Sequence, residues 1–302
     1  MDDVARDVVR PATVAALRDQ LRAQFTHMFD DPAGEARDLL AALHDAPRSW
    51  AAVHATEPVS DLQIDAAFDA AAKRAAGAPL AYATGRAAFR HLFLHVDQRV
   101  LIPRPETEEL VSLALPLITA GSIVVDVGTG SGAIALALAL ESEAERVIGI
   151  DVSADAIAVA GINARALLST KSARVVFLRG NLLEPLGNMC VDVVVSNPPY
   201  IATGERHALP AAVREWEPAL ALFAGDDGME LIRALADRSA DRIRDGGYLL
   251  LEIDSRRGAE ALACVAGPAW HETRLVPDAF GRDRFVVARR AQRGDSGAEP
   301  VP

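Results

Sequence analysis

The feature that most constrains the fold is an alternation of short apolar segments with helical segments over residues 123–288. Seven segments are rich in Val, Ile and Leu, as strands buried on both faces of a sheet are: residues 123–127, 146–151, 174–178, 192–196, 248–253, 272–276 and 284–288. Helical patterns occupy most of the gaps, at 132–140, 154–168, 229–244 and 257–265. This order predicts an α/β fold with a doubly wound, mostly parallel, seven-stranded sheet. Only a turn around Gly281 separates the last two strands, so they are expected to form an antiparallel hairpin at the sheet edge.

The residues before this sheet carry a different pattern. Apolar side chains recur at spacings of three and four from Val14 to Met28, behind Pro11, which we expect in the first helical turn. Ser60 and Gln63 have the spacing of a capping box that opens another helix, whereas residues 92–96 alternate with period two. We therefore expect a small helical domain over 1–81, a β-hairpin linker over 82–104, the α/β domain over 105–290 and a disordered tail over 291–302.

Cysteine content and hydropathy restrict the class of protein. Cys190 and Cys264 are the only cysteines, which excludes a disulfide scaffold and any multi-cysteine metal framework. The acidic start lacks the apolar run of a signal peptide, and the longest strongly apolar stretch, 133–140, is far shorter than the roughly 20 residues that span a bilayer. We expect a cytoplasmic monomer with no membrane partner.

The charge balance argues against nucleic-acid binding. The chain has 31 basic and 42 acidic residues, a formal charge of −11. Residues 1–85 contain 8 basic and 13 acidic side chains, and the remainder contains 23 and 29, so neither part is a basic module. A protein that held duplex DNA through its phosphates would be expected to have a basic domain or face.

A glycine-rich loop follows the first apolar segment. Gly128, Gly130 and Gly132 allow a tight turn and close approach of a ligand to the backbone. Their G-x-G-x-G spacing differs from that of a dinucleotide site, and Asp126 would suit the ammonium group of a methionine-like ligand. The second strand ends at Asp151, where a carboxylate can accept both hydroxyls of a ribose. Together these residues indicate S-adenosylmethionine as the cofactor.

The most specific motif is Asn197-Pro198-Pro199-Tyr200, directly after the fourth strand. Asn197 Oδ1 and the Pro198 carbonyl could accept both hydrogens of a planar –NH₂ group, and Tyr200 offers an aromatic face. We predict Asn197, Pro198 and Tyr200 as catalytic, the whole motif as substrate-binding, and Asn197 as a cofactor contact too. Such chemistry needs no metal, and His91 and His95 are not taken as ligands.

The motif alone leaves the acceptor open, because adenine and a carboxamide both present –NH₂ on an sp² carbon. The rest of the chain resembles the peptide chain release factor glutamine methyltransferase family. This resemblance covers about residues 35–289 and lies in the glycine loop, the Asn-Pro-Pro-Tyr motif and four further segments: Pro79-Leu80-Ala81-Tyr82, Pro103-Arg104-Pro105-Glu106-Thr107-Glu108, Glu217-Pro218-x-x-Ala221-Leu222 and Gly246-Gly247-Tyr248-Leu249-Leu250-Leu251-Glu252. The Pro-Arg-Pro-Glu-Thr-Glu segment favours this family over a sister group that acts on a ribosomal protein.

The resemblance implies an activity and a set of site residues. The implied reaction moves a methyl group from S-adenosylmethionine to the side-chain amide of the glutamine in a release factor's Gly-Gly-Gln loop. The helical domain would help to recognise that protein, and Arg104 to Thr107 would line the cofactor side of the cleft. The implied cofactor contacts are Gly128, Thr129, Gly130, Ser131 and Gly132 at the methionine end, Asp151 at the ribose, and Asn181 with Leu182 at the adenine.

Two positions depart from the family pattern. Asn181 stands where an Asp is common, and Asp254-Ser255-Arg256-Arg257 replaces a Gly followed by a Gln. Three alternatives remain beside the implied function. They are an adenine methyltransferase acting on nucleic acid, a ribosomal-protein glutamine methyltransferase, and a cofactor-binding adaptor without catalysis.

Overall fold

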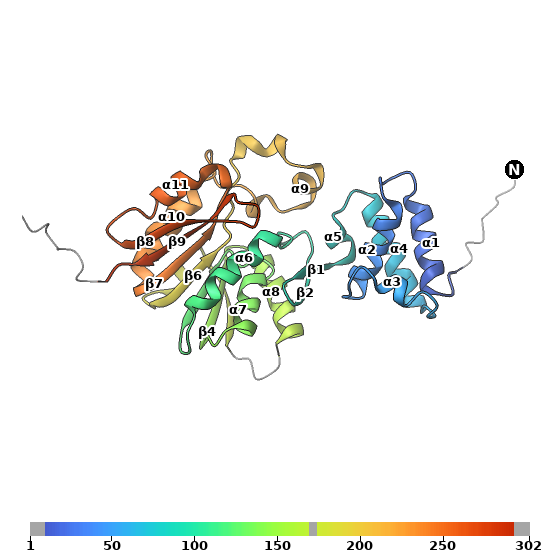
Figure 1. Cartoon of the computed structure of the whole chain (residues 1–302), viewed down its shortest axis with the longest axis horizontal. Coiled ribbons are helices and arrows are strands. Elements are labelled where there is room, and N and C mark those ends of the chain that lie inside the picture. Colours follow the sequence, from blue (N-terminus) through green and yellow to red (C-terminus); the bar gives the residue numbers. More distant parts are fainter. Residues whose placement is uncertain (1–9, 169–173, 293–302) are drawn as a thin grey trace, which may run out of the picture. The chain divides into compact units, whose positions relative to one another are not determined.

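The computed structural model describes residues 10–168 and 174–292, and the chain divides into two compact units, Met1–Ala87 and Ala88–Pro302 (Figure 1). Most of the expected tail, 293–302, lies outside the described residues. Within the described ranges, no helix is long and apolar enough to cross a bilayer.

The first unit is a bundle of short helices. Its members are α1 (Val14–Phe25), α2 (Pro32–Leu43), α3 (Trp50–Val53), α4 (Asp61–Ala75) and α5 (Leu80–Thr84). Its core is formed by apolar side chains from the first four of these helices, including Leu17, Leu21, Phe25, Leu39, Leu40, Ala51, Ala67 and Ala71.

Helix ends in this unit follow their caps. The capping box at Ser60 and Gln63 is confirmed. The first helix, however, begins at Val14 rather than near Pro11, because the Thr13 hydroxyl accepts a hydrogen bond from the Ala16 N–H. Met28 lies beyond the end of α1 and is 54% exposed, so it does not continue the apolar stripe.

A two-stranded hairpin follows α5. It consists of β1 (Arg86–Phe89) and β2 (Leu92–His95) and is shorter than the period-two segment expected from residue 82. Residues 82–84 belong to α5, which ends at Gly85 in the left-handed conformation (φ 69°).

The second unit confirms the predicted α/β fold. Its seven-stranded sheet has the order β5-β4-β3-β6-β7-β9-β8. The strands are β3 (Ile123–Val127), β4 (Arg146–Asp151), β5 (Val175–Arg179), β6 (Val191–Ser196), β7 (Ile243–Glu252), β8 (Trp270–Pro277) and β9 (Asp283–Arg290). β3 to β7 are parallel, and β9 pairs antiparallel with both β7 and β8. The antiparallel pair of β8 and β9 is the hairpin expected from the short turn between them.

Helices flank this sheet. They are α6 (Pro105–Ala114), α7 (Ala133–Glu141), α8 (Ala154–Leu167), α9 (Ala211–Trp216), α10 (Glu230–Arg242) and α11 (Gly258–Ala263). Short 3-10 turns are η1 (Leu115–Leu117), η2 (Glu184–Leu186), η3 (Thr203–Ala208), η4 (Ala219–Ala221) and η5 (Ser255–Arg257). α10 and α11 contribute Ile232, Leu235 and Ala261 to one core with the strands, whereas α7 is buried over nearly its whole length.

The strand order sets the position of the site. Chain order runs outward in opposite directions from the adjacent pair β3 and β6, so a crevice opens at their carboxyl ends. The glycine loop follows β3 and the Asn-Pro-Pro-Tyr motif follows β6. Both predicted loops therefore meet at this crevice.

Candidate active site

A cavity of about 330 Å³ lies at the carboxyl ends of the strands, within the second unit. It is lined by eight residues expected at the site: Gly128, Gly130, Asp151, Asn181, Leu182, Asn197, Pro198 and Pro199. Its other walls include residues of the segments 99–101, 152–156 and 218–221 and of the first turns of α10. Its size lies in the range of small-molecule sites.

The glycine loop presents bare backbone to this cavity. Gly128 and Gly130 have left-handed φ values of 73° and 54°, which an L side chain rarely adopts. The Gly128 and Thr129 N–H groups donate to the Ile150 carbonyl oxygen at 2.8 and 3.0 Å, which anchors the loop to β4. A ligand can thus approach the main chain without meeting a Cβ.

The remaining predicted loop residues lie behind the cavity wall. Thr129 Oγ1 donates to Asp126 Oδ2 at 2.6 Å, and the Ser131 carbonyl accepts a hydrogen bond from the buried Asn163 side chain at 2.8 Å. A Cβ at Gly132 would come within 3.2 Å of Leu136 and Phe177. These contacts shape the loop rather than its ligand-facing surface.

Asp126 differs from the expectation that it faces a ligand. Its side chain is fully buried, and Oδ2 also accepts the Ala135 N–H at 3.1 Å. Oδ1 has no hydrogen-bond partner among the described residues. Burial raises the pKa of Asp126 to about 7. The carboxyl group organises the loop from inside the protein.

Asp151 does line the cavity. Its Oδ2 accepts the Gly130 N–H and its Oδ1 accepts the Ser153 N–H, both at 2.9 Å. Burial raises its pKa, and these N–H groups oppose that effect. Each carboxylate oxygen can accept more than one hydrogen bond, so Asp151 retains capacity for two ligand hydroxyls.

The end of β5 provides the next wall. Asn181 and Leu182 both line the cavity, and Asn181 Nδ2 donates to Glu184 Oε1 at 3.2 Å. The Asn at this position, which departs from the family pattern, therefore keeps its Oδ1 available as an acceptor. Leu182 has a left-handed φ of 50°.

The Asn-Pro-Pro-Tyr motif is held by contacts from three directions. The Ser196 hydroxyl donates to the Val127 carbonyl at 2.6 Å and ties the end of β6 to β3. Asn197 Nδ2 donates to Thr107 Oγ1 at 2.9 Å, and Thr107 Oγ1 donates to Glu252 Oε2 at 2.7 Å. The Tyr200 hydroxyl reaches Glu252 Oε1 at 3.4 Å.

Tyr200 and Thr107 lie behind the cavity wall, not on it. Tyr200 is partly buried and packs against the sheet core, and burial raises the pKa of its hydroxyl. Thr107 was expected along the cofactor side of the cleft, yet it is buried between Asn197 and Glu252. Glu252 is 1% exposed, and burial raises its pKa to about 7.

An ion pair joins two segments that carry cavity-lining residues. Arg104 Nη2 contacts both carboxylate oxygens of Glu217, at 2.6 and 2.8 Å. Glu217 is buried, which raises its pKa, and the charge of Arg104 opposes that rise. The pair holds residues 99–101 and 218–221 in place instead of facing the ligand itself.

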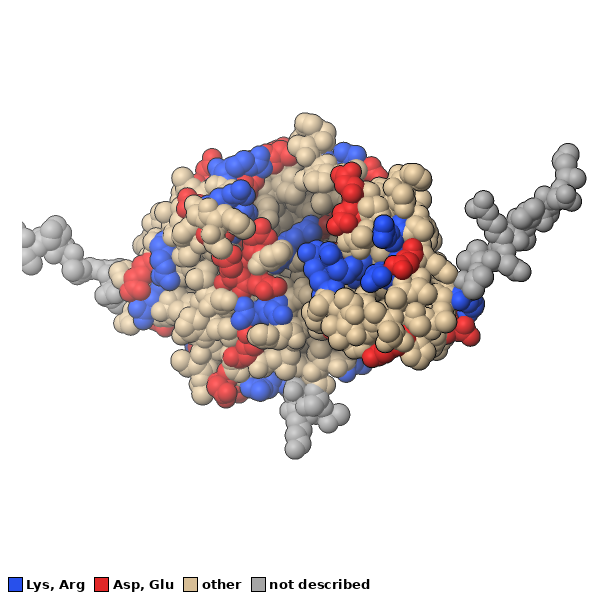
Figure 2. All heavy atoms as spheres, turned by 45° about the vertical axis from the view of Figure 1, so that its right-hand side comes forward, with Lys and Arg blue, Asp and Glu red and all other residues tan. Residues whose placement is uncertain are grey.

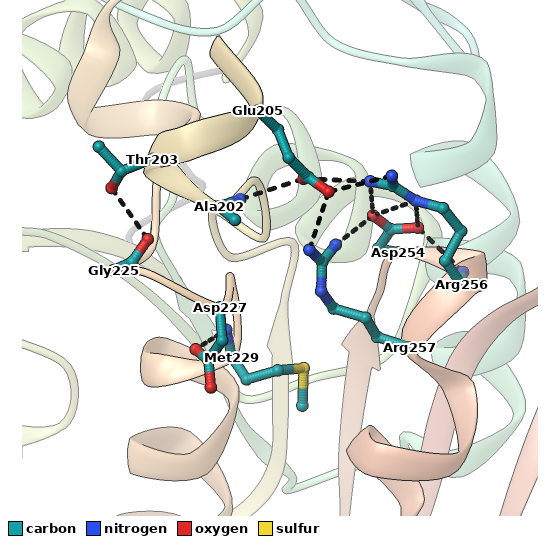
Figure 3. Close-up of polar contacts among 9 residues, drawn as sticks. All are labelled: Ala202, Thr203, Glu205, Gly225, Asp227, Met229, Asp254, Arg256 and Arg257. Carbon is teal, nitrogen blue, oxygen red and sulfur yellow. Dashed lines mark hydrogen bonds and ion pairs between the residues drawn. The ribbon is translucent and has the colours of Figure 1, made fainter. Parts of the chain in front are cut away.

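The second departure from the family pattern forms an ion-pair cluster. Asp254, Arg256 and Arg257 follow β7, and both arginines contact Asp254 and Glu205 (Figure 3). Glu205 Oε2 also accepts the Ala202 N–H at 3.3 Å. The cluster therefore fixes the segment that follows Tyr200 to the carboxyl end of β7.

Glu252, Glu217 and the Glu205 cluster were not predicted as site residues. The signal for Glu252 was available, since it is an acid that ends an apolar strand, as Asp151 is. The other contacts join residues about 50 to 110 positions apart, which no local pattern reveals. His95 contacts Asp97 at 3.1 Å, and the described residues contain no group of three or more potential metal ligands.

Comparison with known proteins covers both units. A family model described as the PrmC N-terminal domain matches residues 16–85, and one described as the methyltransferase small domain matches residues 108–215. A methyltransferase structure from Pyrococcus furiosus shares the fold, with a TM-score of 0.51 and 16% identity over 68% of this chain and 92% of that chain.

Sequence relatives extend over nearly the whole chain. The release factor glutamine methyltransferase of Cereibacter sphaeroides is 38% identical over 90% of this chain and 97% of its own length. Its counterpart from Streptomyces coelicolor is 38% identical over 86% of this chain and 92% of its own length. The chain belongs to the release factor glutamine methyltransferase family.

Proposed function

We propose that the protein transfers a methyl group from S-adenosylmethionine to the side-chain amide nitrogen of the glutamine in the Gly-Gly-Gln loop of peptide chain release factors. Family membership supports this activity. The observation that carries it is the orientation of the Asn197 side chain, whose Nδ2 donates a hydrogen bond to Thr107. This contact leaves Asn197 Oδ1 as an acceptor beside the Pro198 carbonyl, and Asn197 and Pro198 both line the cavity.

The residues around the cavity fit S-adenosylmethionine. The backbone of Gly128 and Gly130 lines the cavity at left-handed φ values that a side chain would strain. We assign it to the methionine end, together with the loop that Thr129, Ser131 and Gly132 shape. Asp151 would hold the ribose hydroxyls, and Asn181 with Leu182 would lie beside the adenine. The cofactor supplies an electrophilic methyl group on a sulfonium sulfur.

The Asn-Pro-Pro-Tyr motif would act by positioning and charge. An amide nitrogen is a poor nucleophile because its lone pair is delocalised. Asn197 Oδ1 and the Pro198 carbonyl would accept its two hydrogens and direct the nitrogen toward the methyl group. The same acceptors would offset the positive charge that develops during transfer. Tyr200 would support the motif from behind, since it contacts Glu252 and the core.

Residues 1–81 would recognise the release factor, 82–104 would link the domains, and 105–290 would catalyse. The N-terminal family model, which matches residues 16–85, supports a separate domain in this part of the chain. We further propose that the protein acts as a cytoplasmic monomer without binding nucleic acid directly. The net charge of −11 supports the absence of direct nucleic-acid binding. The face in Figure 2 carries groups of acidic side chains beside groups of basic ones.

Methyl transfer from labelled cofactor to a purified release factor tests the proposal. The Asn197→Ala variant should lose about 10²-fold in kcat, by analogy with loss of one preorganised hydrogen-bonding group, while cofactor affinity changes by less than about threefold. Asn188→Ala, at an exposed turn, is the matched control. A release factor without the loop glutamine should remain unlabelled.

Other patterns of labelling favour the alternatives. Label in DNA or RNA would favour an adenine methyltransferase, and label in a ribosomal protein alone would favour the sister activity. Cofactor binding without transfer to any of these acceptors would favour an adaptor. Full activity of Asn197→Ala would overturn the assigned role of the amide.

A further inference from the structure

We propose that Glu252, acting through Thr107, sets the orientation of the Asn197 carboxamide and is thus a positioning residue for the methyl transfer. This inference rests on the proposed function. It concerns three side chains that the fold brings together from the first turn of α6, the end of β6 and the last residue of β7.

The contacts form a short buried chain. Thr107 is 4% exposed and Glu252 is 1% exposed, so water does not compete for their polar atoms. The distances are 2.9 Å from Asn197 Nδ2 to Thr107 Oγ1 and 2.7 Å from Thr107 Oγ1 to Glu252 Oε2. Each contact lies in the normal hydrogen-bond range.

The donor and acceptor inventory gives this chain one direction. A carboxylate has no hydrogen to donate, so Thr107 must donate its single hydroxyl hydrogen to Glu252. The Thr107 oxygen can then only accept from Asn197, and the one Asn197 side-chain atom that donates is Nδ2. Oδ1 is left as the carboxamide atom that can serve the substrate.

Reversal of the direction of hydrogen-bond donation, from Glu252 toward Asn197, would oppose the reaction. If Glu252 donated to Thr107, the Thr107 hydroxyl could donate to Asn197 Oδ1 and stabilise the flipped carboxamide. The flipped amide would present N–H groups to the substrate –NH₂, where an acceptor is needed. The anionic state of Glu252 therefore favours the productive orientation.

The same carboxylate also supports the other end of the motif. Its Oε1 faces the Tyr200 hydroxyl at 3.4 Å, three residues beyond Asn197. One buried group thus contacts both the threonine that holds Asn197 and the tyrosine that ends the motif.

The surroundings of Glu252 make its charge sensitive to pH. Burial raises its pKa to about 7, Glu106 adds to the rise, and Thr107, Arg284 and Tyr200 oppose it. Protonation below this pH would release the orientation of Asn197. The rate of methyl transfer should therefore decline on the acidic side of about pH 7 in the parent protein and much less in a Glu252→Gln variant.

Isosteric substitutions test the chain of contacts. Glu252→Gln replaces the carboxylate, which only accepts, by an amide that can also donate to Thr107, and Thr107→Val removes the hydroxyl. Each should lower kcat by roughly 10- to 100-fold, equivalent to about 1.4 to 2.7 kcal/mol, with less than about a threefold change in cofactor affinity. Thr107→Ser, which keeps the hydroxyl, should recover most of the activity that Thr107→Val loses. Glu143→Gln, an exposed position, is the matched control.

A double substitution separates positioning from general stability. In an Asn197→Ala background, Glu252→Gln should lower kcat by less than about twofold, because the group that it orients is already gone. An additive loss in the double variant would overturn the proposal. Equal activity of Thr107→Val and the parent would also overturn it, and this arm remains decisive if Glu252→Gln does not fold.

A readout without a methyl acceptor keeps this inference distinct from the proposed function. The side-chain NH₂ resonances of Asn197, identified by their loss in Asn197→Ala, should exchange slowly with solvent in the parent. They should shift and exchange faster in Glu252→Gln and Thr107→Val. Unchanged resonances would refute the positioning of Asn197 by Glu252 and Thr107 even in an active enzyme. Absence of methyl transfer by the parent would refute only the proposed function.

Discussion

At the scale of single residues, Gly228 lies where any side chain would collide with the Asn-Pro-Pro-Tyr motif. Its φ is 73°, and a Cβ would lie 2.4 Å from the Tyr200 carbonyl oxygen and 3.1 Å from the Ala202 nitrogen. Gly228→Ala should therefore displace the backbone that follows Asn197 and lower kcat by about tenfold or more, equivalent to about 1.4 kcal/mol.

Gly121→Ala is the matched control for this substitution. Gly121 has a similar φ of 87°, but a Cβ added there would meet no heavy atom within 4 Å beyond its own chain neighbours. The variant should show only the cost of a left-handed alanine, about 1–2 kcal/mol of unfolding free energy, with unchanged kcat. Thermal unfolding and methyl-transfer assays compare the pair, and equal kcat in both variants would contradict the proposed collision.

Asp126 should make stability depend on pH. Its folded-state pKa of about 7 is above the unfolded value of 3.8, so the folded protein binds the proton more tightly. The stabilisation that the protonated Asp126 gives to the folded state is complete below about pH 4 and is lost as pH rises to about 7. Asp126→Asn keeps an acceptor for Thr129 and Ala135 but does not titrate.

The parent should thus lose stability relative to Asp126→Asn between pH 5 and pH 8. Between these pH values, the difference in unfolding free energy between the two proteins should change by on the order of 2–3 kcal/mol, at about 1.4 kcal/mol per pKa unit. Thermal unfolding of both proteins at each pH measures it. A difference in Tm that is the same at pH 5 and pH 8 would show that Asp126 does not titrate in this window.

At the scale of elements, local pattern predicted most of the sheet. β3 and β4 have the predicted bounds because their segments, rich in Val and Ile, end before a glycine and at an acid. β7 begins at Ile243, five residues before the expected start. The first half of this strand is polar, and it extends the strand because Ile243 pairs with Val191, not because of its own hydropathy. Such cross-strand partners are invisible in a local window.

The segment between Tyr200 and α10 shows the same limit more strongly. η3 and α9 were not predicted, because they are short and most of their residues face solvent. Long-range contacts place this segment, above all those of Glu205 with Arg256 and Arg257. Sequence patterns thus identified the ligand-facing loops, whereas the residues that hold those loops required the tertiary structure.

Arg256 and Arg257, the two arginines that contact Glu205, should contribute unequally to the stability of the fold. Arg257 has 15% and Arg256 has 64% of its side chain exposed, although both contact Glu205 and Asp254. Solvent screens the exposed ion pairs of Arg256, so Arg256→Ala should lower the free energy of unfolding by less than about 1 kcal/mol. Arg257→Ala should cost about 1–3 kcal/mol, because it removes partners from the largely buried Asp254 carboxylate.

Denaturant unfolding at low and high salt measures this difference. The loss in Arg257→Ala should persist at 0.5 M NaCl, and the smaller loss in Arg256→Ala should shrink. A larger cost for Arg256→Ala would mean that exposure does not rank these contacts. A parallel decline of kcat in Arg257→Ala would link the cluster to the placement of the motif.

At the scale of the whole molecule, acidic charge is shared by both units. Residues 1–87 carry 13 acidic against 9 basic side chains, and the remainder carries 29 against 22. The cavity, by contrast, is lined mostly by glycine, proline and aliphatic residues. Charge on the surface can therefore act on a protein partner while the cofactor site is governed by short-range contacts.

This separation predicts different salt dependence for the two ligands. If acidic surfaces help to dock basic patches of a release factor, added salt should weaken that association, since the screening length falls from about 10 Å at 0.1 M to about 3 Å at 1 M. Most of the change should appear in the association rate, as electrostatic steering requires. Cofactor affinity should vary by less than about twofold over the same range.

Stopped-flow association with a release factor and calorimetric titration of the cofactor at 0.05 to 0.5 M NaCl make this comparison. Neutralising exposed acids one unit at a time, for example Asp61→Asn and Asp65→Asn in the first and Glu143→Gln in the second, would show which surface steers the partner. A release factor association rate that does not depend on salt would remove the role of the −11 charge, and docking would then rest on shape and apolar contacts alone.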